Sequence, residues 1–197
     1  MGRPREHDER TRQALLDAAE ELLAEGGEAA LSVRAVADRS GVSTRAVYSL
    51  FGSKEGLLFA LAEHGFALLA ELVEKLPQTA DPIDDVVSAC IHGFRRWALR
   101  HPPLFRLAFD RLVVDSPEGR RVSAAGRGAL DQLRARVKRA RDAGLLGARD
   151  LDEVTVEVHA LCEGLATVER RGRMLPRRAQ ERAWRDALEA LLRGLRR

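Results

Sequence analysis

The chain has 197 residues, of which 45% are hydrophobic and 32% are charged. This composition excludes a wholly disordered chain, and the length fits one medium domain or a small domain fused to a larger one. The 33 lysines and arginines exceed the 30 aspartates and glutamates by only three, and residues 1–60 carry eight basic against ten acidic side chains. Bulk charge therefore does not locate a nucleic-acid site, and any such site must be inferred from local pattern.

The chain carries no sign of export or of a bound metal. Its N-terminus lacks the apolar segment of a signal peptide, and no apolar run approaches the roughly 18 to 20 residues of a membrane span. The two cysteines, Cys90 and Cys162, lack metal-site spacing and are expected to be ordinary buried thiols. We therefore expect a soluble, cytoplasmic protein without a membrane partner, a metal or a cofactor.

Apolar residues recur every three or four positions along almost the whole chain, which predicts helices, whereas the alternation typical of strands is scarce. Prolines and glycines divide this pattern into segments of helical length. The expected fold is all-α, with about nine helices, no strand and no internal repeat. The expected helices cover residues 9–25, 33–39, a short stretch after 43 or 44, 54–76, 82–100, 103–114, 117–143, 151–170 and 176–193.

Several of these helices begin with recognisable caps. Asp81 precedes Pro82, and Ser116 precedes Pro117, which is the order of an N-cap residue followed by proline in the first turn. Asp150 stands three residues before an acidic side chain, as in a capping box. These positions are therefore predicted to be helix starts.

The stretch LSVRAVADRSGVSTRAVYSLF, residues 31–51, differs from the rest because its helical pieces are too short to stand alone. Ser32 can cap the first piece, and Gly41 lies where a tight turn favours positive φ. Ala37, Gly41 and Val47 form the packing skeleton of a helix-turn-helix, with Phe51 closing the core. Such a unit presents the start of its second helix to the major groove of DNA.

The side chains expected at that helix start are Ser43, Thr44, Arg45 and Tyr48. The planar donor fork of Arg45 suits a guanine edge, and Thr44 offers a methyl or hydroxyl group. Ser32, Tyr48 and Lys54 are better placed for phosphates. The alternatives are that Tyr48 is a core aromatic and Arg45 a solvated arginine.

These residues resemble the tetracycline-repressor (TetR) family of bacterial transcriptional regulators. The resemblance covers residues 9–60 and includes the spacing Tyr48-x-x-Phe51-x-x-Lys54. By the same resemblance, Arg3 and Arg5 look like a basic arm that follows the minor groove. The segment 159–164, HALCEG, is similar to a C-terminal domain type with a Trp/His-Gly signature, although Glu163 stands where that signature has histidine.

The resemblance implies a homodimeric repressor that binds palindromic, double-stranded operator DNA and responds to a small-molecule effector. The helix-turn-helix domain is expected at residues 1–53, and the effector-binding and dimerisation domain at residues 54–197. The last two helices would pair with those of a second subunit, and the effector would displace the helix that begins near Lys54. The family implies a regulator and not an enzyme.

The effector is expected to be largely apolar, because five of the nine aromatic residues fall within residues 66–109. The alternative, that these rings pack a dry core, applies to each of them singly. His159 and Glu163 lie one helical turn apart and are further pocket candidates, although a local ion pair is the simpler interpretation. The aromatic candidates are Phe66, Phe94, Trp97, Phe105 and Phe109.

Two interpretations from other classes remain open on the sequence alone. One is a helical enzyme that uses His159, Glu163 or Cys162, but no nucleophile–base pair or metal set has suitable spacing. The other is a helix-turn-helix used only for protein contacts. Binding that weakens steeply with salt would distinguish DNA recognition from such a contact.

Overall fold

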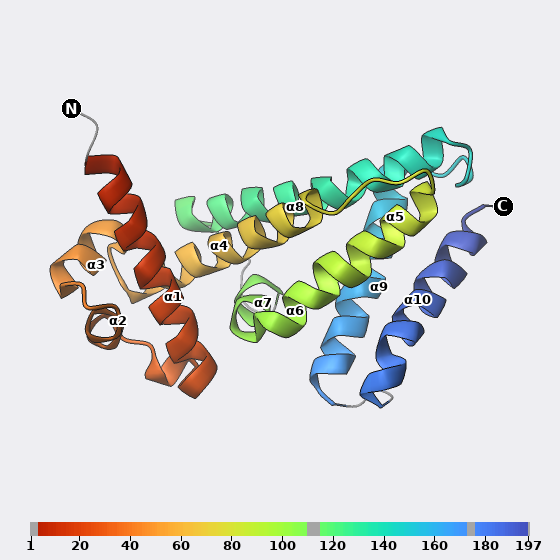
Figure 1. The fold of residues 1–197 in the computed structure, drawn as a ribbon. Coiled ribbons are helices and arrows are strands. Elements are labelled where there is room, and N and C mark those ends of the chain that lie inside the picture. The colour runs from red at the N-terminus through yellow and green to blue at the C-terminus, as the bar shows by residue number, and fades with distance from the viewer. Residues whose placement is uncertain (1–3, 110–114, 173–175, 197) are drawn as a thin grey trace. The chain divides into compact units, whose positions relative to one another are not determined.

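The computed structural model describes residues 4–109, 115–172 and 176–196. Over these ranges the chain is all-α and contains no strand, as predicted (Figure 1). One continuous helix is formed by α5, the π-helical segment η1 and α6, which follow one another without a break. Counted in this way, the described chain has nine helices, as expected. The bounds are α1 Pro4–Ala30, α2 Val33–Ser40, α3 Thr44–Phe51, α4 Lys54–Glu74, α5 Pro82–Ser88, η1 Ala89–Arg95, α6 Arg96–Arg100, α7 Pro102–Phe109, α8 Pro117–Asp142, α9 Leu151–Arg170 and α10 Arg177–Gly194.

The predicted helix starts are confirmed by their hydrogen bonds. An Asp81 carboxylate oxygen accepts from the backbone N–H groups of Ile83 and Asp84, with Pro82 in the first turn. The Asp150 carboxylate likewise accepts from two backbone N–H groups at the start of α9, and these bonds lower the pKa of Asp150. Each cap satisfies amide donors that have no partner inside the helix.

The expected stop after residue 25 is a break within α1. Gly26 and Gly27 have non-helical backbone angles, with Gly27 at φ 63° and ψ −158°, before the last turn continues to Ala30. The helix expected over 103–114 is α7, described from Pro102 to Phe109. The part of that expectation beyond residue 109 lies outside the described residues.

The helix expected over 82–100 contains a π-helical segment that the sequence did not predict. Within η1, a Cβ atom on Gly93 would lie only 2.6 Å from Val73 Cγ2. The close approach of η1 to α4 therefore favours a glycine here, because a larger residue would force Val73 to shift. π-Helical turns are rare and occur frequently at functional sites.

The chain divides into two compact units, Met1–Phe66 with His101–Ala125 and Ala67–Arg100 with Gly126–Arg197. We call them unit 1 and unit 2. Helices α4 and α8 contribute residues to both. These units are defined by compactness and not by function. The expected boundary between the DNA-binding domain and the effector-binding domain, after residue 53, stays a prediction.

Each unit has its own core. In unit 1, Leu15 and Leu16 of α1 are fully buried, together with Leu57 and Leu61 of α4. In unit 2, the fully buried side chains include Trp97, Trp184 and Leu188. These leucines and tryptophans fix the helices that carry the candidate sites.

Among the described residues, one helix is long and apolar enough to cross a membrane by length and composition alone. This helix is α4, and half of its most apolar 18-residue window is buried within the protein. A core helix passes the same test because it is apolar on several faces.

Candidate functional site

Helices α2 and α3 form the predicted two-helix unit. The turn between them has Gly41 at φ 70° and ψ 18°, in the left-handed region, and the Val42 N–H donates to the Ala37 carbonyl at 3.1 Å. Ala37 and Val47 are buried where the two helices pack. The glycine, the small residue and the valine therefore have the packing roles that their spacing predicted.

An ion-pair cluster joins α2 to α1. The Arg39 guanidinium donates to both carboxylate oxygens of Glu25, at 3.0 and 2.8 Å, and to Glu21 at 3.2 Å. The hydrogen bond from Arg39 lowers the pKa of Glu25, and the two glutamates raise the pKa of Arg39. This cluster orients α2 on α1 by geometry, although exposed pairs of this kind add little stability.

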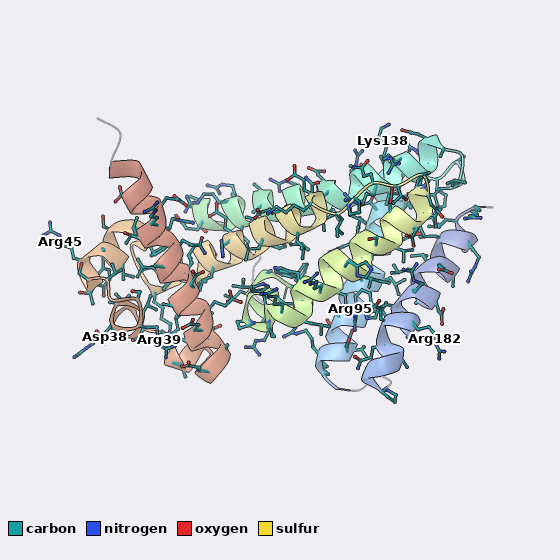
Figure 2. The ribbon with its side chains drawn as sticks, in the orientation of Figure 1. Asp38, Arg39, Arg45, Arg95, Lys138 and Arg182 are labelled. Atoms are coloured by element: carbon teal, nitrogen blue, oxygen red, sulfur yellow. The ribbon has the colours of Figure 1, made fainter. Side chains whose placement is uncertain are left out.

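The start of α3 is exposed, as predicted. Thr44 and Arg45 are exposed, and Tyr48 keeps 56% of its surface accessible. Figure 2 shows the Arg45 side chain extending away from the ribbon of α3. Ser49 is also exposed, and at four residues from Arg45 it shares the same helix face. Ser49, which was not among the residues predicted from the sequence, is thereby a further candidate for this face.

The two predicted serine contacts are helix caps in the structure. Ser32 Oγ accepts from the Ala35 N–H at 3.1 Å, and Ser43 Oγ accepts from the Ala46 N–H at 3.3 Å. Both residues are exposed. Because a hydroxyl that accepts one hydrogen bond still has its own proton to donate, capping leaves each serine a donor for a phosphate oxygen.

Lys54 lies at the first position of α4, where its Nζ donates to the Glu28 carbonyl at 2.8 Å. Sequence reasoning did not foresee this contact with the last turn of α1. An ammonium group has three donors, so the contact leaves two for a phosphate. The predicted phosphate role of Lys54 remains a prediction.

The α3–α4 turn depends on a glycine that the sequence analysis did not single out. A Cβ atom on Gly56 would lie 1.9 Å from the carbonyl oxygen of Phe51, where no such atom fits. Ser53 Oγ caps α4 by accepting from the Gly56 N–H at 3.0 Å. Phe51 is half-buried, with the Arg12 guanidinium 5.9 Å from its ring centre.

The predicted basic arm is described only in part. Arg3 lies outside the described residues. Arg5 belongs to the backbone of α1, which begins at Pro4, so the backbone at this position is helical and not an extended arm.

The five aromatic pocket candidates fall into two groups, one in each unit. In unit 1, the Phe109 ring lies 5.5 Å from Phe66 and 4.9 Å from Phe105, measured between ring centres. In unit 2, the Phe94 ring lies 6.3 Å from Trp97 and 5.7 Å from His159. The sequence predicted the five as one set, and within each unit these ring contacts bring its members together.

His159 and Glu163 face each other along α9, with Nε2 and an Oε atom 3.7 Å apart. Burial lowers the pKa of His159, and the Glu163 charge opposes that shift. Nearby, hydrogen bonding to Cys90, together with burial, raises the pKa of the Cys162 thiol. A raised thiol pKa disfavours the reactive thiolate.

Two family models match the chain. The one described as bacterial regulatory proteins, tetR family, matches residues 15–61. The one described as tetracyclin repressor-like, C-terminal domain, matches residues 87–193. Together they cover the two-helix unit and most of the helices after it.

Individual relatives agree with these matches. The HTH-type transcriptional regulator Rv1816 of Mycobacterium tuberculosis is 29% identical over 115 residues, 57% of this chain and 49% of that protein. The chain thus spans about half the length of the curated relatives it matches.

Solved structures share the fold. A protein of unknown function from Rhodococcus sp. RHA1 is 27% identical, with a TM-score of 0.83 over 95% of this chain and 96% of the other. The regulator PfmR from Thermus thermophilus, described as a TetR family transcriptional regulator, is 26% identical, with a TM-score of 0.71 over 93% of this chain and 99% of the other.

Proposed function

Because the chain belongs to the TetR family of bacterial regulatory proteins, we propose that it is a repressor that binds a palindromic operator as a homodimer and is released by a small-molecule effector. The family and the names of the relatives indicate a transcriptional regulator and not an enzyme. DNA binding through the helix-turn-helix is the family's shared property. Repression, release by an effector and a cytoplasmic location are the proposed additions.

The exposed start of α3 is the observation that carries the proposal. The exposed side chains there are Thr44, Arg45 and Tyr48. Behind them, the residues that pack α2 against α3, Ala37 and Val47, are buried. A guanidinium fork donates two hydrogen bonds to the O6 and N7 atoms of guanine, which face the major groove. Arg45 is therefore assigned to a base, and Ser32, Ser43, Tyr48 and Lys54 to phosphates.

Charge supports recognition by a few contacts. Residues 1–60 have two more acidic than basic side chains, so general attraction to the DNA backbone is weak. High affinity then requires that both reading helices of a dimer bind at once. This requirement makes the spacing between them a means of regulation.

An exposed stripe of α9 supports pairing with a second copy. Val156, Ala160, Gly164 and Val168 recur every four residues and are all exposed, the two valines at 54% and 42%. They share one helix face, and their small side chains permit close packing of another helix. Apart from Gly164, its two chain neighbours and the nearby backbone of α9, no heavy atom of the described residues lies within 4 Å of the position where a Cβ of Gly164 would be. We propose that α9 and α10 form the dimer interface.

The effector pocket is assigned to the part of the chain from residue 54 onward. Each unit offers its own candidate lining. The candidates in unit 2 are Phe94, Trp97, His159 and Glu163, and those in unit 1 are, separately, Phe66, Phe105 and Phe109. Reading helices that bind the same face of DNA must lie about 34 Å apart. An effector that favours a dimer of different spacing would release the operator.

Selection of bound fragments from random duplex DNA tests the proposed function. We expect a palindrome whose half-sites lie about one helical turn apart, bound with an affinity that falls steeply as salt rises. The selected duplex then serves to screen small molecules for release. If no duplex is enriched, and if the protein instead binds other proteins with an affinity that does not depend on salt, the helix-turn-helix serves protein contacts and not DNA recognition.

The dimer is tested separately by Gly164→Leu, with Gly128→Leu of α8 as a matched control. Both glycines are exposed, and in either case an added Cβ would meet no described atom outside the local backbone of its own helix. Sedimentation should show that Gly164→Leu is monomeric, because its side chain blocks close packing of α9, whereas Gly128→Leu should remain dimeric. A Gly164→Leu dimer as tight as the wild type would place the interface elsewhere.

A further inference from the structure

His64 of α4 is a half-buried histidine that lies outside the proposed DNA-binding and effector sites. Its Nε2 is 3.4 Å from Nε2 of the Gln13 side chain, on α1. The same Gln13 nitrogen donates to an Asp17 carboxylate oxygen at 2.7 Å. All three residues belong to unit 1. One contact between α1 and α4 therefore passes through an amide group that lies between an imidazole and a carboxylate.

The Asp17 carboxylate determines which way the Gln13 amide points. An ionised carboxylate only accepts hydrogen bonds, so the amide nitrogen, and not its oxygen, must face it. That nitrogen carries two protons and can donate the second one to His64. The imidazole nitrogen that accepts this bond must then be unprotonated, because a ring nitrogen that carries a proton can only donate. The arrangement thus selects the neutral form of His64.

The charges around His64 also bear on its protonation. The groups that face it come from α1 and from the position before α7, and they are Arg12, Asp17, Glu20 and His101. His101 is itself paired with Glu20, whose Oε1 lies 2.7 Å from its Nδ1. Burial lowers the pKa of His64; the two carboxylates oppose this shift, whereas Arg12 and His101 add to it. Hydrogen bonding and burial therefore favour the same, neutral imidazole.

Protonation of His64 would place two donors against each other. The new proton on Nε2 would face the N–H group of Gln13. The amide cannot turn its oxygen towards the imidazole without giving up its bond to Asp17. Acid therefore breaks one of these two hydrogen bonds, whichever way the amide turns.

Helix α1 connects this contact to the rest of unit 1. It is joined to α2 by the ion pairs of Glu21 and Glu25 with Arg39. It is joined to the start of α4 by the bond from Lys54 to the Glu28 carbonyl. A change in how α1 lies on α4 thus affects the two-helix unit to which the proposed function assigns the binding of DNA.

We propose that His64 makes unit 1 sensitive to acid: protonation of its imidazole loosens α1 from α4 and weakens the binding of DNA. The part that concerns DNA rests on the proposed function, whereas the part that concerns stability does not. The folded protein binds this proton less readily than the unfolded chain does. The contribution of His64 to stability is therefore complete above the ordinary histidine pKa of 6.5 and is lost as the pH falls through the lower pKa of the folded state.

NMR titration of the imidazole C–H groups in the full-length protein measures the protonation of His64 directly, and the loss of one signal in His64→Gln assigns it. We expect His64 to titrate below pH 6.5 in the wild type. In Gln13→Glu a carboxylate accepts from the protonated imidazole, so His64 should titrate at a higher pH than in the wild type. Titration of wild-type His64 at or above pH 6.5, or an unchanged titration in Gln13→Glu, would overturn the proposal.

Affinity for the selected duplex is compared at about pH 7.5 and about pH 5.5, between which histidine changes its charge. The matched control is His92→Gln, because His92 is an exposed histidine of η1. We expect acid to weaken binding by the wild type and by His92→Gln at least about fivefold more than binding by His64→Gln. Gln13→Glu should also lose the acid effect, which keeps the experiment decisive if His64→Gln does not fold.

The outcomes separate this proposal from the proposed function. Equal pH dependence of binding in the wild type and in His64→Gln would overturn the acid-sensing role while leaving DNA binding intact. A wild-type protein that selects no duplex would overturn the proposed function instead. Urea unfolding over the same pH range would then still decide the role of His64, because only the wild type should lose this part of its stability in acid.

Discussion

Replacing Arg95 with methionine should destabilise unit 2 severely. The Glu169 side chain is only 4% exposed and accepts from Arg95 Nε at 3.0 Å, from Arg95 Nη2 at 2.9 Å and from Trp184 Nε1 at 2.8 Å. These bonds join η1 to α9 and α10; Figure 2 marks Arg95. Methionine fills most of the volume of the arginine but leaves a buried carboxylate without its cation.

The expected cost follows from that geometry. Removing one partner of a buried ion pair costs about 3–5 kcal/mol, because the remaining charge stays desolvated. In the double variant Arg95→Met/Glu169→Gln the buried charge is gone, and the amide oxygen still accepts from Trp184. The double variant should therefore recover at least about half of the loss.

Urea unfolding followed by circular dichroism measures both effects, at one protomer concentration because dimerisation adds to apparent stability. The matched control is Arg185→Met, which removes a more exposed pair with Asp84 and should cost only about 0.2–1 kcal/mol. If Arg95→Met costs no more than that control, Arg95 does not compensate the charge of Glu169. The reasoning would also fail if the double variant were as unstable as Arg95→Met.

Three further changes test the DNA-binding unit. Arg45→Ala should weaken binding to the selected duplex by about 1–3 kcal/mol and relax the preference at one base pair; an equal loss on random DNA would exclude base contact. Lys54→Ala should weaken binding to all duplexes and reduce the slope of log affinity against log salt concentration by about one. An unchanged slope would show that the Lys54 ammonium does not contact a phosphate and only binds the Glu28 carbonyl of α1. Gly56→Ala should cost about 1–3 kcal/mol or more in unfolding free energy, because its methyl group would meet the Phe51 carbonyl. Gly128→Ala in open space should stabilise slightly, and equal stabilities would refute the steric argument.

The helix boundaries could be predicted because their signals are local. Asp81 and Pro82 specify a helix start by their own side chains, and Gly41 specifies a turn by its φ angle. The π-helical segment could not be predicted in this way. This segment packs Gly93 against Val73 of another helix. The two residues are twenty positions apart, so the three- and four-residue spacing of apolar residues cannot indicate that they are close.

The features of the candidate site that depend on local spacing could also be predicted, whereas those that depend on contacts between distant residues could not. The exposed face with Arg45 and Tyr48 follows from helical spacing once Val47 is placed inside. The Arg39–Glu25 cluster joins residues fourteen positions apart and depends on how α2 packs on α1. For the same reason, composition grouped five aromatic residues, whereas only the fold determines which rings meet.

Methylation protection of guanine N7 on the selected duplex tests the central claim most directly, because N7 lies in the major groove. If Arg45 contacts a guanine, the protein should protect one guanine in each half-site, about one helical turn apart. Arg45→Ala should remove this protection, while complexes should still form at higher protein concentration. Stable complexes in which the wild type leaves every guanine N7 reactive would contradict this claim.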